Sequence, residues 1–233
     1  MKLFKNIKNW LENQEHLFYL FLFILIVPNM VLCFTEPLPF MAKVANVLLP
    51  FGCYYLLMTL SRNCGKMLWI LFLFLFFGAF QIVLLYLFGQ SIIAVDMFLN
   101  LVTTNSSEAL ELLDNLTPAI IAVIILYVPA LILGMISIIR KRKLTVEFIR
   151  RERKRAFLVF GISLLSLVGA YVQDSGYELK SDLYPLNVCY NVGLAFQRTA
   201  LTQDYHRTSK DFTFHARTLI VPDVEQFPGH IAC

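Results

Sequence analysis

Twenty-two consecutive residues without a charged side chain decide the fold: MLWILFLFLFFGAFQIVLLYLF, residues 67–88. A helix needs about 20 mostly apolar residues to cross the hydrocarbon core of a bilayer. This stretch is long enough for one crossing, and it is rich in the Phe and Leu side chains that insert favourably into lipid. It therefore predicts a transmembrane helix.

Four further stretches have the same character: residues 17–34, 42–60, 118–139 and 156–172. Hydrophobic residues make up 58% of the 233-residue chain and charged residues 15%, whereas a soluble domain has about 45–50% and about 25%. We expect an all-α membrane protein, with five transmembrane helices in residues 1–172. Thr117 and Pro118 predict the start of the fourth helix, as N-cap and first helical residue. Gly161, Ser163, Ser166 and Gly169 predict a packing face on the fifth.

The basic residues indicate the orientation. If all five spans form, three segments lie on one side, and they carry Lys2, Lys5, Lys8, Arg62, Lys66 and the nine Lys and Arg residues of 140–155. The opposite loop, residues 90–117, contains neither Lys nor Arg. Because short cytoplasmic loops are enriched in Lys and Arg, we expect a cytoplasmic N-terminus and an external C-terminus. We interpret 140–155 as a topology determinant that meets anionic lipids, and we expect no nucleic-acid partner.

The external loop, residues 90–117, contains the candidate functional residues. Its pattern predicts two short helical pieces, 92–101 and 106–116, that present six polar or acidic side chains: Asp96, Asn100, Thr104, Glu108, Glu111 and Asp114. Asn100, Thr104 and Glu108 are spaced by four, so one side of a continuous helix would offer an amide, a hydroxyl and a carboxylate. Such a set suits a headgroup with an ammonium group, which the carboxylate would pair with. A structural alternative stays open, because Asn105 followed by Glu108 also fits a capping box.

This loop resembles the corresponding loop of the lipid A phosphoethanolamine transferases, which include the mobile colistin-resistance enzymes. The similarity rests on Asp96, Asn100, Thr104, Glu108 and Ala109, and the five-span layout is similar too. The resemblance implies that Asn100, Thr104 and Glu108 line the site of the donor lipid, phosphatidylethanolamine. It also implies a bacterial inner-membrane location with a periplasmic C-terminus, and lipid A as the acceptor.

In that family a periplasmic domain with a threonine nucleophile and zinc ligands performs the transfer. This chain ends at Cys233, before the family's Gly-Glu-(Ser/Thr) motif. We therefore expect no catalytic residue, zinc ligand or cofactor within it, and no activity of the chain alone. Residues 173–233 are expected to form a periplasmic connector, with an amphipathic helix over 184–199 and a short extended run at 218–221.

Two other functions stay open from the sequence. The chain could be a non-enzymatic lipid-binding or assembly protein, since a lipid-facing loop needs no catalysis to be useful. It could also be the membrane domain of a related glycerol-phosphate transferase, which shares the five-helix layout.

Overall fold

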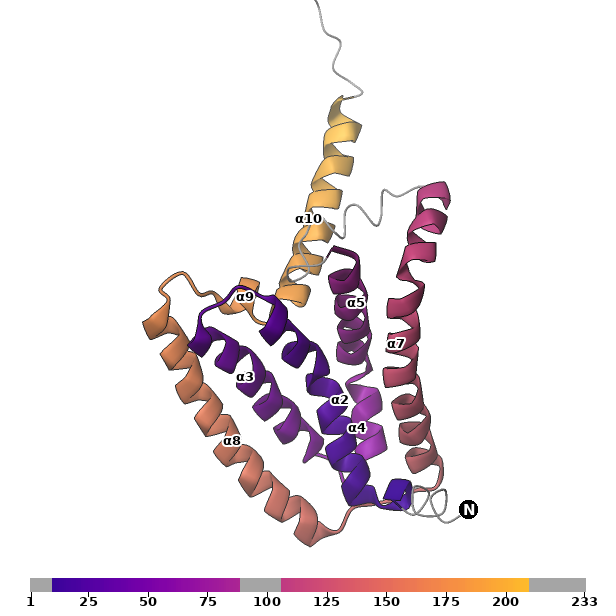
Figure 1. Cartoon of the computed structure of the whole chain (residues 1–233), viewed down its shortest axis with the longest axis vertical. Helices are drawn as coiled ribbons and strands as arrows, with labels where there is room; N and C mark the ends of the chain where they lie inside the picture. The colour runs from indigo at the N-terminus through magenta and orange to yellow at the C-terminus, as the bar shows by residue number, and fades with distance from the viewer. Residues whose placement is uncertain (1–9, 89–105, 210–233) are drawn as a thin grey trace, which may run out of the picture. The chain divides into compact units, whose positions relative to one another are not determined.

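The computed structural model describes residues 10–88 and 106–209, and for residues 84, 87, 88, 106–115 and 203–209 it describes the backbone alone. All regular elements in these two ranges are helices (Figure 1). Four are long and apolar enough to cross a membrane: α2 (Gln14–Thr35), α3 (Phe40–Met58), α7 (Ser106–Ile139, its apolar part from Leu116) and α8 (Val146–Gln173). The all-α class is confirmed, and the helices indicate a multi-pass membrane protein.

The third predicted span is broken. Residues 64–88 form two helices, α4 (Cys64–Ile70) and α5 (Phe72–Phe88), with a bend of 62° between α4 and Phe72–Val83. They make a fifth crossing only if the bent pair acts as one span. The break at Leu71 has neither Pro nor Gly beside it. Trp69 stacks on Phe72 across the bend, with ring centroids 5.7 Å apart.

The fourth span starts earlier than the sequence predicted. Helix α7 begins at Ser106 and continues through Pro118 and Pro129 to Ile139. Thr117 is therefore inside the helix and is not its N-cap. Proline lacks one helical N–H, yet the helix is continuous through Pro118. The predicted separate piece at 106–116 and the fourth span are thus one element.

The fifth span also starts earlier, so half of the predicted basic loop is helical. Helix α8 begins at Val146, after the N-cap Thr145, whose side chain accepts a hydrogen bond from the Phe148 N–H at 3.2 Å. Its small-residue face differs from the predicted one. A Cβ added to Gly161 would meet no atom within 4 Å, whereas Ser163 is fully buried.

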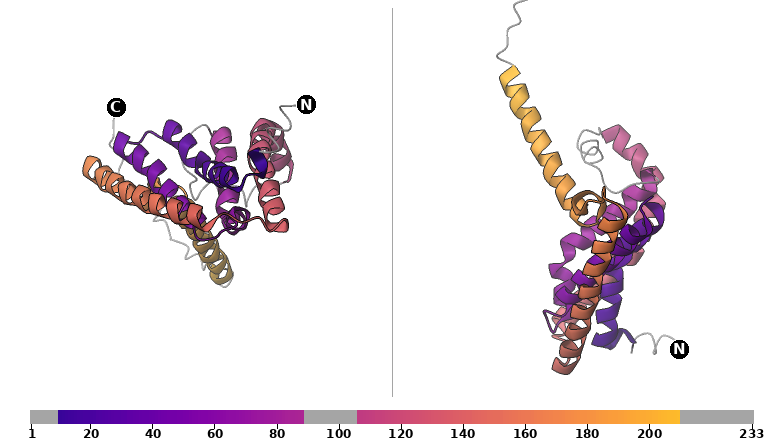
Figure 2. Two further views of the ribbon diagram at one scale, coloured as in Figure 1. Left: turned by 90° about the horizontal axis from the view of Figure 1, so that it is seen from below. Right: turned by 90° about the vertical axis from the view of Figure 1, so that its left-hand side faces the viewer.

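Helices α3 and α8 lie side by side along much of their length (Figures 1 and 2). Their contact is made through small side chains that let the two backbones approach. A Cβ added to Gly52 of α3 would lie 3.1 Å from the Phe160 Cα and 3.2 Å from the Ser163 Oγ. Ala156 and Ala170, seven residues on either side of Ser163, are also fully buried.

Helix α2 packs against α3, α4, α5 and α7 and supplies much of the core. Phe18 and Phe21 are fully buried, and Phe18 meets the Phe148 ring edge-on at 5.5 Å.

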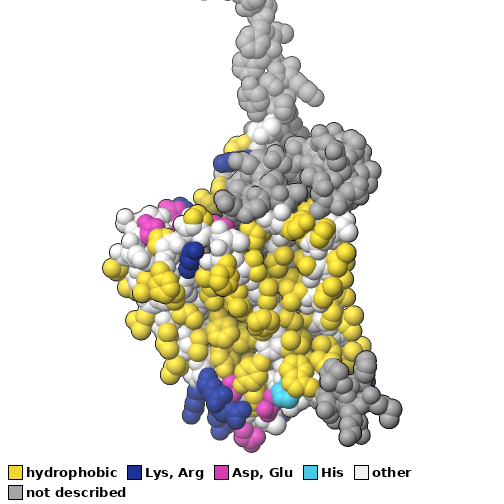
Figure 3. Space-filling model, in the orientation of Figure 1, with side chains coloured by type: hydrophobic (Ala, Val, Ile, Leu, Met, Phe, Trp, Pro, Cys, Tyr) yellow, Lys and Arg dark blue, Asp and Glu magenta, His cyan; other side chains and the backbone are white. Residues whose placement is uncertain are grey.

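By contrast, Ile125 and Ile132 of α7 are exposed. Exposed apolar side chains form a broad hydrophobic band (Figure 3), as expected of a surface that faces lipid.

Basic side chains gather at one end of this band (Figure 3). We call it the arginine end; it is where α7 and α3 end and α8 begins, and its residues include Arg62, Arg140, Arg142, Arg150 and Arg153. We call the other end, where α2 ends and α3 begins, the distal end. Because α7 ends at the arginine end, its first residues lie toward the distal end.

After α8 come the short helix α9 (Leu179–Asp182) and α10 (Leu186–Ser209). The chain divides into two compact units, Met1–Ala195 and Phe196–Cys233. A helix was predicted at 184–199, and α10 forms there with a later start and a later end. The predicted extended run at 218–221 lies outside the described residues.

Candidate functional site

Of the three residues proposed to bind a headgroup, the structure places one. Asn100 and Thr104 lie outside the described residues. Glu108 is on the described backbone of α7, in its first turn. The convergence of the three side chains therefore stays a prediction.

The continuity of α7 places Glu108 relative to the apolar part of the helix. Its apolar part begins at Leu116, eight residues after Glu108, which is about 12 Å of helix. The other end of the same helix leads directly to Arg140. Glu108 is thus held beyond the apolar part, on the side away from the arginines.

A polar network closes the distal end of the bundle. The Asn29 Nδ2 of α2 donates hydrogen bonds to the main-chain oxygens of Asn46 (2.9 Å) and Tyr184 (2.7 Å). The Asn46 Nδ2 donates to the Asp182 oxygen at 2.6 Å, and the Asn46 Oδ1 accepts from the Tyr177 hydroxyl at 2.5 Å. The two asparagines therefore hold the segment after α8 against α2 and α3.

The hydroxyls of Tyr177 and Tyr184 in this segment act as hydrogen-bond donors. Burial raises the pKa of the Tyr177 hydroxyl above its ordinary value, and the neighbouring Asp182 carboxylate raises it further. Burial also raises the pKa of Tyr184, whose hydroxyl donates to the Phe74 main-chain oxygen at 3.2 Å. Both phenols stay protonated at neutral pH, so the network carries no charge of its own.

Part of this region is left without hydrogen bonds. Asn187 is fully buried, and neither polar atom of its amide has a partner among the described residues. The Asn29 Oδ1 is likewise unpaired there. Buried polar groups normally find a protein or water partner, so these amides have the capacity to bind an additional polar group.

An apolar cavity of about 270 Å³ lies beside this segment. It is lined by α3, α5, α8 and residues 183–186, including Leu49, Cys53, Phe74, Phe160, Leu183 and Pro185. Its lining is almost wholly apolar, which suits a stretch of acyl chain. A polar network and an apolar cavity thus meet at the segment that follows α9.

The sequence analysis missed a buried carboxylate at the arginine end. Glu152 of α8 is 0% exposed and accepts hydrogen bonds from the Tyr55 hydroxyl (2.5 Å), the Arg151 Nε (3.0 Å) and the Arg155 Nη1 (2.9 Å). With three donors on it, this carboxylate joins α8 to α3. The available signal was a single acid within a run of basic residues on an apolar helix face.

The described residues contain no group of three or more His, Cys, Asp or Glu side chains that could hold a metal ion. The zinc that the family resemblance implies was expected outside this chain, and it stays a prediction.

Comparison of the chain with family models, with curated proteins and with solved structures gave no match. The function is therefore argued from the residues and their placement.

Proposed function

We propose that the loop at 90–117 and the first turns of α7 bind the headgroup of phosphatidylethanolamine at the membrane surface. In this proposal the Glu108 carboxylate pairs with the ammonium, and Asn100 and Thr104 donate hydrogen bonds to the phosphate oxygens. The chain would hold the donor lipid for transfer of phosphoethanolamine to a lipid A phosphate, as the membrane domain of the transferases that it resembles. The transfer chemistry would come from a catalytic domain outside this chain.

The observation that carries the proposal is the distribution of charge along α7. Residues 90–117 contain Asp96, Glu108, Glu111 and Asp114 and no basic residue, while the nine basic residues of 140–155 follow the other end of the helix. An acidic surface next to the bilayer favours a headgroup with a cationic amine over one that is only anionic. Phosphatidylethanolamine offers that amine together with a phosphate for hydrogen bonding.

The distal network and cavity support lipid binding at this end. Among the described residues, the amide of Asn187 and the Asn29 Oδ1 have no hydrogen-bond partner, so they could bind a polar group of a lipid. The apolar cavity beside Leu183 and Pro185 suits an acyl chain.

The same asymmetry supports the orientation that we propose. With the arginine end in the cytoplasm, the positive-inside rule is satisfied, and the loop at 90–117 faces the periplasm. The location would be the bacterial inner membrane, with the donor lipid in its outer leaflet and the C-terminus periplasmic.

The test is lipid binding to the purified chain in detergent, measured by native mass spectrometry with phosphatidylethanolamine and phosphatidylcholine. Wild type should prefer phosphatidylethanolamine, because a choline group has no N–H to donate. Glu108→Gln should weaken that binding about tenfold, as expected from loss of one charge-assisted hydrogen bond.

Asp114→Asn is the matched control. It removes one negative charge from the same helix, six residues further along and on another face of a regular helix, and it should change binding less than twofold. Equal losses in the two variants would reduce the effect to overall charge, and no loss in Glu108→Gln would refute the assignment.

A further inference from the structure

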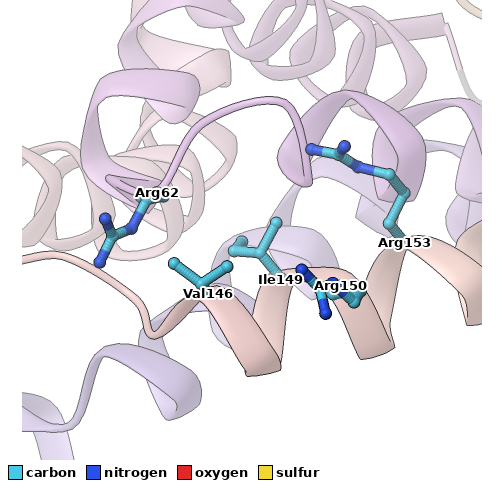
Figure 4. A pocket seen from close by; sticks show the side chains of 5 residues that line it. All are labelled: Arg62, Val146, Ile149, Arg150 and Arg153. Atoms are coloured by element: carbon cyan, nitrogen blue, oxygen red, sulfur yellow. The ribbon is translucent and has the colours of Figure 1, made fainter.

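A second site for a lipid is built at the arginine end, between the end of α3 and the start of α8. A cavity of about 300 Å³ is lined there by Arg62, Val146, Ile149, Arg150 and Arg153 (Figure 4). Three of the five side chains are guanidinium groups, and no acidic side chain is among them. Such a cluster favours a phosphate group.

Two of the three arginines are held in place by backbone groups. The Arg62 Nε donates to the Leu144 oxygen at 3.0 Å, and the Arg153 Nη2 donates to the Thr59 oxygen at 2.8 Å. A guanidinium has five N–H donors, so each keeps most of its donors for a ligand. Fixed side chains lose little conformational entropy when a ligand binds.

The third arginine is uncommitted. Arg150 makes no hydrogen bond or ion pair with the residues that the structure describes. The nearby carboxylate of Glu152 accepts hydrogen bonds from Tyr55, Arg151 and Arg155 instead. The positive charge of the cavity is therefore not neutralised by that carboxylate, and the start of α8 at Val146 adds the positive end of a helix dipole.

A second, largely apolar cavity shares Arg153 with the first. Its volume is about 210 Å³, and it is lined by Leu56, Leu57, Thr59, Leu60, Arg153 and Phe157. Leu60 and Phe157 are well exposed, at 67% and 62%, so they face the surrounding lipid. A basic pocket followed by an apolar groove along α3 and α8 has the two parts that a phospholipid needs.

We propose that this α3–α8 groove binds one anionic phospholipid of the cytoplasmic leaflet. Its phosphate lies among Arg62, Arg150 and Arg153, and one acyl chain lies along Leu60 and Phe157. The site differs from the proposed headgroup site at the distal end in position and in charge, so the two stand or fall separately.

The experiment is native mass spectrometry of the full chain with phosphatidylglycerol, phosphatidylcholine and inorganic phosphate as probes. Wild type should bind one phosphatidylglycerol at least tenfold more tightly than phosphatidylcholine. Arg150→Gln should weaken it about tenfold and is the preferred variant, since Arg150 has no structural bond to lose. Arg153→Gln should act in the same direction, and Phe157→Ala should weaken binding of the lipid by a smaller factor.

Lys154→Gln is the matched control, because Lys154 is on the same helix and lines neither cavity. It should change binding less than twofold, and Glu108→Gln should leave phosphatidylglycerol binding unchanged. Equal affinity for the two lipids, an equal loss in Lys154→Gln, or displacement of the lipid by millimolar inorganic phosphate would each overturn the proposal.

Discussion

The sharpest structural prediction concerns the contact between α4 and α7 at Gly65. A Cβ added there would lie 2.2 Å from the Gly134 main-chain oxygen and 2.9 Å from its carbonyl carbon. Both atoms belong to the backbone, so no side-chain rotation can relieve the overlap. Gly65→Ala must push the two helices apart and lose packing around Leu68, which is fully buried.

The cost follows from two opposing effects. Overpacking a close contact costs about 1–3 kcal/mol, and a backbone clash belongs at the top of that range. The higher helix propensity of alanine returns up to about 1 kcal/mol. The net loss is about 2 kcal/mol, which lowers the ratio of folded to unfolded protein about thirtyfold.

The assay is reversible unfolding in mixed detergent–SDS micelles, followed by far-UV circular dichroism. Gly161→Ala is the control, since an added Cβ there meets no atom within 4 Å and should be neutral or stabilising by up to about 1 kcal/mol. If Gly65→Ala unfolds at the same SDS fraction as Gly161→Ala, the close contact of α4 with α7 is wrong.

Three further predictions use the same unfolding assay. Tyr55→Phe removes the hydroxyl that donates to the Glu152 carboxylate and should cost about 1.5–3 kcal/mol; no change would show that this bond does not join α3 to α8. Asn46→Leu removes the side chain that binds Asp182 and Tyr177, so it should destabilise by about 2 kcal/mol and speed hydrogen exchange in residues 177–184; unchanged exchange would contradict the network. Asn187→Leu removes a buried amide without partners among the described residues and should be neutral or stabilising in lipid-free detergent, whereas a loss like that of Asn46→Leu would show that its amide is bonded.

The sequence predicted the helices better than their ends. Apolar runs of bilayer length located the long helices, because lipid requires an apolar surface whatever the neighbours are. The prediction of the third span as one straight helix was wrong. The bend at Leu71 has no Pro or Gly next to it, so none of the usual local signals for a helix break marks it.

The remaining errors have a similar origin. Thr117-Pro118 is a good local start signal, yet the helix formers before it extend α7 by three turns. The basic run that begins at Arg140 was interpreted as a loop because it is charged, yet Thr145 caps a helix within it, and α8 begins at Val146.

The candidate sites show the same limit. Asn100, Thr104 and Glu108 follow from spacing on one segment, which a sequence displays. The cavity of the α3–α8 groove is lined by Arg62 together with Arg150 and Arg153. In the distal network, Asn29 is hydrogen-bonded to Tyr184. Such sets are assembled by packing between distant segments, so no spacing rule could find them.

The most direct test of the proposed function is to locate the bound donor lipid. A phosphatidylethanolamine with a photoreactive group near its headgroup, crosslinked to the chain in bacterial inner membranes, can be mapped by peptide mass spectrometry. We predict adducts concentrated in residues 96–114, and fewer of them in Glu108→Gln. Adducts spread along the chain, or concentrated at the arginine end, would contradict the proposal that this loop and the start of α7 hold the ethanolamine headgroup.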